Sequence, residues 1–261
     1  MKIQDMPPKD VIEPSWYASY EQNIEAVWWQ LVRLNSTFFV LEKILSFPFD
    51  LFQPMPGTKN FWKLVENALF ETCVLIIWRV GVDNVYNEGL TLQQLKNQIF
   101  QHLRREDYHI QLKDIFKKGH FDGRISSLEP KIREIRHNYI AHYNLAKNVS
   151  PTPEQIKQRP LLLSELKQYQ NTLNDYFDLL CFGHQRALLP IDYHPDVIHP
   201  VGTDSRSDIE RLLDNVARES SLLNLPENNP DHWNAFRRNL SKENIQTINK
   251  YRVKFELPPV Q

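Results

Sequence analysis

The chain has 261 residues, of which 41% are hydrophobic, and a formal net charge of −1. This length and hydrophobic share suffice for a packed core, so an intrinsically disordered chain is excluded as the default. The near-zero charge excludes the strongly basic character of many nucleic-acid-binding domains, and any contact with RNA must therefore come from a local basic patch.

Residues that break helices are few and clustered. The sequence contains 7 glycines, and its 17 prolines fall mainly in short segments, which leaves long windows suited to helices. We therefore predict an all-α fold. Cys73 and Cys181 lie in apolar contexts without metal-type spacing, so we expect reduced thiols, no metal and no cofactor. The N-terminal residues lack the apolar core of a signal peptide, and the longest apolar run, Cys73–Trp78, is too short to span a bilayer. Both features favour a cytoplasmic protein without membrane contact.

The first half of the chain predicts two long helices. From Trp16 to about Phe47, apolar residues recur in steps of three and four, which describes one helix face. A segment rich in proline and glycine follows. The second helix, from about Phe61 to Val80, is apolar nearly all round in its middle, which is typical of a central helix.

Three further helices are expected before the most pronounced composition break. Thr91 is a plausible N-cap for the third. Gly119, Gly123 and Pro130 are interpreted as breakers or helix starters, so the fourth helix is predicted from about Leu128 to Lys147. The fifth is predicted from Leu161 to about Leu188.

The segment 189–202, LPIDYHPDVIHPVG, is the best candidate linker. It divides the chain into a helical domain, residues 1–188, and a small C-terminal helical extension, residues 203–261. Two helices are predicted in the extension, the second starting after Asn229, Pro230 and Asp231.

The sequence RHNYIAHYN, Arg136 to Asn144, is the leading candidate for a functional site. It brings one arginine, two histidines and two asparagines onto a predicted amphipathic helix, beside apolar Ile135 and Ile140. A helix that only packs has little reason to collect such groups, because each one buried without a partner costs about 1–3 kcal/mol.

The spacing within this motif favours a site shared between two chains. Arg136 and His142 are six residues apart, so they point about 120° away from each other around one helix. Two copies of the helix packed across a two-fold axis would bring them together in one cleft. Asn138 shares a helix face with His142 and is suited to orient its imidazole.

These residue types suit cleavage of an RNA phosphodiester. A histidine with a pKa near 6.5 can take the proton of a ribose 2′-OH or donate one to the departing 5′-oxygen. An arginine offers fixed donors to the charge that develops on the phosphate. A histidine on an inner helix row is nevertheless most often a satisfied core residue, and that interpretation stays open.

Lys131 and Arg133, just ahead of Arg136, form the local basic patch. We expect Lys131, Arg133 and Tyr143 to contact RNA. The competing interpretation is a solvated charged face balanced by Glu129 and Glu134.

The string IREIRHNYIAHYN resembles the arginine-to-histidine signature of the HEPN superfamily (higher eukaryotes and prokaryotes nucleotide-binding), in which a polar residue follows the arginine and a histidine lies four to six residues on. Here these are Arg136, His137 or Asn138, and His142. The form R-x-x-Y-I-A-H is similar to that of the abortive-infection AbiU-like branch, and LIIWRVGVDN followed by EGLTLQQLKNQI resembles the preceding part of that branch. The resemblance covers about Trp16 to Leu188.

The resemblance implies an up-and-down helical bundle, a homodimer around the motif helix, and metal-independent endoribonuclease activity in a bacterial toxin or antiphage system. Arg136 and His142 would be catalytic, with His137 and Asn138 in support, and an antitoxin or other regulatory protein is a possible partner. A related toxin group carries a modifiable tyrosine two residues after the histidine, but here Asn144 takes that place. The alternative is a non-catalytic HEPN-type module that binds a nucleotide, RNA or a protein.

Two other groups of residues are interpreted as structural. His184, His194 and His199, with Asp192 and Asp196, lie in and beside a proline-broken segment that cannot readily preorganise metal ligands, so we interpret them as loop residues. Trp28 and Trp29 are interpreted as core or interface anchors, because they lie in helical phase with leucines.

Overall fold

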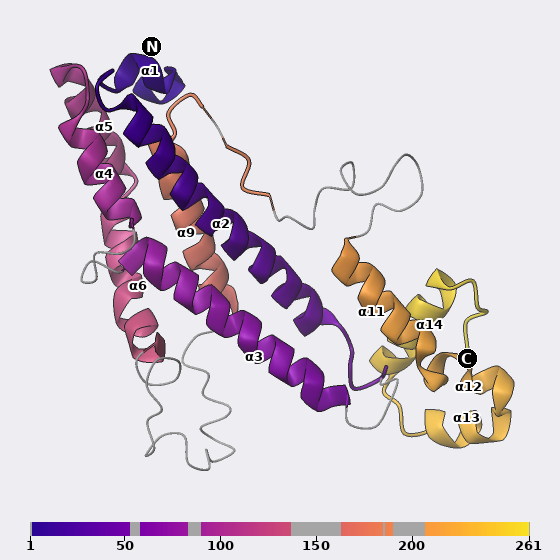
Figure 1. The fold of residues 1–261 in the computed structure, drawn as a ribbon. Coiled ribbons are helices and arrows are strands. Elements are labelled where there is room, and N and C mark those ends of the chain that lie inside the picture. The colour runs from indigo at the N-terminus through magenta and orange to yellow at the C-terminus, as the bar shows by residue number, and fades with distance from the viewer. Residues whose placement is uncertain are drawn as a thin grey trace. The chain divides into compact units, whose positions relative to one another are not determined.

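The computed structural model describes residues 2–52, 58–82, 90–136, 163–184, 186–189 and 207–260 (Figure 1). Within these ranges the regular secondary structure is helical, and the β-type pairing there is an isolated bridge between Ile12 and Leu103. The predicted all-α class is confirmed for this part of the chain.

The chain forms two compact units, each built from two separate stretches of sequence. The first comprises residues 1–39 and 69–191, and the second comprises residues 40–68 and 192–261. The contribution of residues 40–68 to the second unit was not expected from the sequence. Most of the predicted linker, 189–202, lies outside the described residues, so the boundary drawn there stays a prediction.

The first unit is a set of helices packed around α2 and α9. Its elements are α1 (Pro8–Val11), α2 (Tyr17–Ser46) up to residue 39, α3 (Thr58–Ile77) from residue 69, a π-helical turn (Trp78–Val82), α4 (Leu92–Gln101), α5 (Glu106–Lys118), α6 (Phe121–Ile135) and α9 (Leu163–Leu180). The predicted helices at 16–47 and 61–80 correspond to α2 and to α3 with its π-helical turn. Thr91 caps α4 as predicted, since its hydroxyl accepts from the Gln94 backbone N–H while the Gln94 side chain accepts from the Thr91 N–H.

The core of this unit is apolar with one buried amide cluster. Leu31 and Leu34 of α2 and Leu173 and Phe177 of α9 are fully buried. Asn35 lies among them: its amide nitrogen donates to the Leu188 carbonyl at 2.6 Å, and its amide oxygen accepts from the side chains of Gln170 and Asn174. These hydrogen bonds satisfy a polar group that would otherwise destabilise the core.

The predicted start of the motif helix near Leu128 was wrong. The helix α6 begins at Phe121 and contains both Gly123 and Pro130 in its interior. An interior proline costs about 3 kcal/mol and an interior glycine about 1 kcal/mol. Ile125, Ile132 and Ile135 are buried on one side of α6, and each buried isoleucine contributes about 1.5–3 kcal/mol. Packing therefore outweighs the local preference.

The predicted end of the fifth helix near Leu188 was also wrong, because α9 ends at Leu180. Phe182 has a φ of 53°, which ends regular helix, and a Cβ at Gly183 would lie 3.0 Å from the carbonyl oxygens of Asp5 and Met6. The carbonyls of the following residues accept hydrogen bonds from side chains of α2. Trp28 Nε1 donates to Ala187 O at 2.9 Å. The hydrogen bonds that would extend α9 are thus replaced by contacts with α2 side chains.

The second unit contains four C-terminal helices where two were predicted. They are α11 (Asp208–Glu219), α12 (Ser221–Asn228), α13 (Pro230–Arg237) and α14 (Lys242–Lys254). Three side chains cap the starts of α12, α13 and α14 by accepting a hydrogen bond from a backbone N–H: Ser220, Asn229 and Ser241. Because of these caps, four separate helices form where the sequence predicted two. Residues 40–68 join this unit through Phe47 and Phe52, whose rings contact Tyr251.

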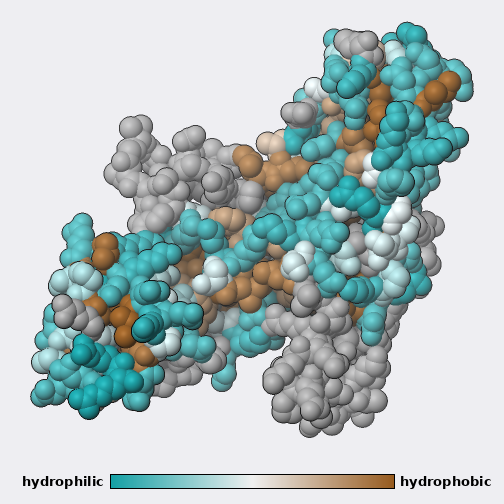
Figure 2. Space-filling view, turned by 180° about the vertical axis from the view of Figure 1, so that it is seen from behind, coloured by the Kyte–Doolittle hydropathy of each residue, from teal (hydrophilic) through white to brown (hydrophobic). Residues whose placement is uncertain are grey.

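The surface drawn in Figure 2 is mostly hydrophilic, with hydrophobic side chains visible between the hydrophilic ones. Some large apolar side chains are exposed, among them Phe61, Leu64 and Ile110. No helix in the described ranges is both long and apolar enough to cross a bilayer.

Gly123 provides a test of the α6 boundary. Since no atom lies within 4 Å of a Cβ added there, Gly123→Ala is expected to stabilise the protein by about 0.5–1 kcal/mol, measured by urea unfolding. Gly119→Ala is the matched control, because its Cβ would overlap the Phe121 ring, and it is expected to destabilise. A destabilised Gly123→Ala variant would contradict the interior position of Gly123 in an unstrained helix.

Candidate functional site

The C-terminal end of α6 is the described part of the predicted site. Arg136 keeps helical backbone angles, and its N–H donates to the carbonyls of Ile132 and Arg133. The other predicted catalytic residues, His137, Asn138 and His142, and the predicted RNA contact Tyr143 lie outside the described residues. The structure therefore describes one member of the predicted catalytic set.

Two neighbouring elements hold this end of α6. Ile132 and Ile135 are buried, 0% and 2% exposed, and α6 packs against both α9 and the π-helical turn. A Cβ on Gly81 of this turn would lie 3.1 Å from Leu173 Cδ2, so α9 approaches the turn closely. The packing fixes the turn, and with it Trp78, beside the end of α6.

The guanidinium of Arg136 lies over the indole of Trp78. Its central carbon is 4.9 Å from the ring centroid, and Trp78 is 6% exposed. A cation over an aromatic face is stabilised by about 0.5–2 kcal/mol, depending on how far it is desolvated. The half-buried Arg136 is thereby oriented while its N–H groups, in the plane of the guanidinium, keep their capacity to bind an anion.

No carboxylate among the described residues forms an ion pair with Arg136, which distinguishes it from the other cations of α6. Arg133 also lies over Trp78, at 5.9 Å, but it pairs with Glu129. Lys131 pairs with Glu165 of α9, and this hydrogen bond raises the pKa of Lys131. Both pairs are exposed to solvent, where ion pairs stabilise a fold only weakly. Of the two carboxylates named in the charged-face interpretation, Glu129 forms an ion pair with Arg133, whereas Lys131 pairs with Glu165. The assignment of Lys131 and Arg133 to RNA binding stays a prediction.

The remaining candidates are the histidines and carboxylates of the predicted linker region and the two cysteines. His184 is exposed, its proposed companions His194 and His199 lie outside those ranges, and no group of three metal-binding side chains occurs within them. Cys73 and Cys181 are free and buried as expected, and burial raises the pKa of each thiol to about 12, so both stay protonated at neutral pH.

Comparison of the chain with protein-family models, curated proteins and solved structures finds no match. The interpretation of the site consequently depends on its residues and their geometry.

Sequence reasoning missed the role of Trp78. The run VLIIWRV belongs to the predicted central helix, and no role was predicted for Trp78, which faces the end of α6. Sequence reasoning also missed Lys96, which lies between the buried residues Leu95 and Ile99 and is itself 8% exposed. A lysine on an inner helix row could have indicated a buried ion pair.

Proposed function

We propose that the protein is a metal-independent endoribonuclease of a bacterial defence or toxin system, and that it has the helical bundle of the HEPN superfamily, whose sequence signature the motif resembles. In this proposal Arg136 and His142 form the catalytic core, His137 and Asn138 support it, and two chains join through the motif helix. Lys131, Arg133 and Tyr143 would contact the RNA.

The position of Arg136 is the observation that supports this proposal best. An arginine held by an aromatic face, without a described carboxylate on its N–H groups, is suited to bind a phosphate. As charge develops on the phosphate during cleavage, fixed donors of this kind stabilise the transition state. His142, as general base or acid, would contribute about 10²- to 10⁴-fold.

The proposal is tested by RNA cleavage with purified protein in EDTA. Wild-type protein is expected to cleave, and His142→Ala is expected to lose about 10²-fold or more of that rate. His232→Ala, which removes an exposed imidazole on α13, is the matched control and should cleave like the wild type. Cleavage that EDTA abolishes, or equal cleavage by all three proteins, would contradict the mechanism.

The second candidate is a non-catalytic module that binds a nucleotide, RNA or a protein at the same motif. It would be supported if folded wild-type protein bound RNA without cleaving it and Arg136→Ala weakened the binding.

A further inference from the structure

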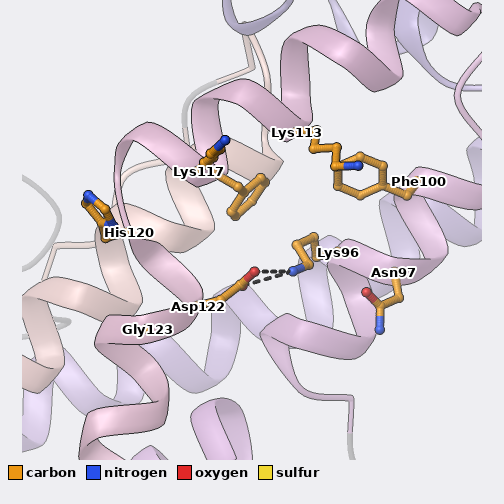
Figure 3. A pocket seen from close by; sticks show the side chains of 9 residues that line it. Lys96, Asn97, Phe100, Lys113, Lys117, His120, Asp122 and Gly123 are labelled. Carbon is orange, nitrogen blue, oxygen red and sulfur yellow. Dashed lines mark hydrogen bonds and ion pairs between the residues drawn. The ribbon is translucent and has the colours of Figure 1, made fainter.

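A cavity of about 610 Å³ lies between α4, α5 and α6 of the first unit (Figure 3). Its volume is in the range typical of small-molecule sites. Lys113 and Lys117 of α5 line it from one side, and Phe100 of α4 and Asp122 of α6 line it from others. The cavity is separate from the motif, because Asp122 and Arg136 are fourteen residues apart on α6, about 21 Å along its axis.

The cavity carries an excess of positive charge. Lys96 is neutralised by Asp122, with its Nζ 2.8 and 2.9 Å from the two carboxylate oxygens (Figure 3). The remaining lysines of the cavity, Lys113 and Lys117, are exposed and pair with no described carboxylate; the neighbouring Asp114 pairs with Lys118 at 2.5 Å. His120, just before α6, also lines the cavity. The two lysines are four residues apart on one face of α5, so both ammonium groups can reach one anion.

An aromatic wall lies beside these charges. Phe100 is half-buried, and its ring centroid is 6.4 Å from that of the buried Phe116. The Lys96 ammonium lies 5.3 Å from the Phe116 ring centroid and helps to hold that ring in place. A half-exposed ring next to free ammonium groups suits a ligand with a flat ring and a phosphate.

Asp122 is held in place by hydrogen bonds, but its carboxylate can accept further ones. It accepts from Lys96 and, at 3.0 Å, from the hydroxyl of Tyr176, whose own pKa is raised by burial and by the Asp122 charge. Its side chain is nevertheless 53% exposed. A fixed, half-exposed carboxylate is a suitable acceptor for a sugar hydroxyl.

We propose that this cavity binds a nucleoside monophosphate, with the phosphate between Lys113 and Lys117, the base against Phe100 and a ribose hydroxyl on Asp122. The site does not depend on the endoribonuclease activity proposed for the motif, and it would exist in a non-catalytic protein as well.

The test is calorimetric titration of the full chain with the four common ribonucleoside monophosphates, with adenosine and inorganic phosphate as partial ligands. At least one monophosphate is expected to bind more tightly than either partial ligand. Lys113→Gln and Lys117→Gln should each weaken its binding about tenfold or more. Lys118→Gln, which removes the same charge one residue further along α5, should leave the affinity unchanged. Gly123→Leu should abolish binding by filling the cavity, because a side chain at Gly123 extends into open space.

The proposal is overturned if no monophosphate binds, or if inorganic phosphate alone binds as tightly. Equal weakening by Lys117→Gln and Lys118→Gln would indicate unspecific attraction by α5 and would likewise overturn it. Binding of an RNA oligonucleotide that depends on Lys113, without binding of any monophosphate, would assign the surface to RNA. RNA cleavage is measured in parallel and should be unchanged in the lysine variants, so failure of this site and failure of the catalytic proposal are distinguishable.

Discussion

Replacing Arg136 with alanine is expected to lower the rate of RNA cleavage by about 10²- to 10³-fold, as is typical when a donor to a developing oxyanion is removed. The arginine lies 4.9 Å over the Trp78 indole, so its guanidinium is oriented before any RNA binds. Alanine removes both the charge and the oriented donors. The measurement is single-turnover cleavage of a labelled RNA, which separates the chemical step from RNA binding.

Two further variants control this result. Arg133→Ala removes a guanidinium that also lies over Trp78 but is paired with Glu129, and it is expected to change cleavage only a few-fold. Arg136→Lys keeps the charge but loses the planar donors, so its rate should fall between those of the wild type and Arg136→Ala. If Arg136→Ala stays folded and cleaves at the wild-type rate, Arg136 does not act in cleavage.

The largest expected loss of stability follows from replacing Arg252 of α14 with alanine. Arg252 is 0% exposed, and its Nε donates to the Pro258 carbonyl at 2.7 Å. The guanidinium also donates to the Leu223 carbonyl and pairs with Glu227, whose pKa it lowers through this hydrogen bond. The Glu227 side chain is 46% exposed, so most of the cost comes from the hydrogen bonds lost to the two carbonyls and from the void. We expect a loss of about 3 kcal/mol or more, measured by urea unfolding.

Arg238→Ala is the matched control, because this arginine is exposed just after α13. It should change the free energy of unfolding by about 0.5 kcal/mol or less. Equal unfolding midpoints for the two variants would show that the contacts of Arg252 do not stabilise the second unit.

The sequence predicted helices well where one local signal dominates. The apolar period of α2 and the Thr91 cap of α4 are properties of adjacent residues, and both predictions are confirmed. Prediction failed where distant contacts decide. The end of α9 involves Asp5 and Met6, which lie against Gly183. Gly183 is itself a common helix-stop residue, but the approach of residues so distant in sequence cannot be deduced from residues 180–188.

In the candidate site, too, local features were predicted from the sequence and contacts between distant residues were not. The motif was found from its polar residues, but the orientation of Arg136 depends on Trp78, 58 residues earlier in the chain. The cavity was missed because its lining comes from three helices, and one of them, α5, was not among the predicted helices. Lysines on a surface helix are ordinarily solvated, so the sequence alone does not indicate that Lys113 and Lys117 line one cavity.

The π-helical turn at Trp78–Val82 has a consequence for how the site can change. In such a turn each hydrogen bond spans five residues instead of four, so the segment holds one residue more than an α-helix of the same reach. Deleting a single residue would restore α-helical winding and change the directions in which the remaining residues of the turn face. The direction in which the indole faces is therefore set by the number of residues in the turn as much as by their identity, and an insertion or deletion there would uncouple Arg136 from its support without altering either side chain.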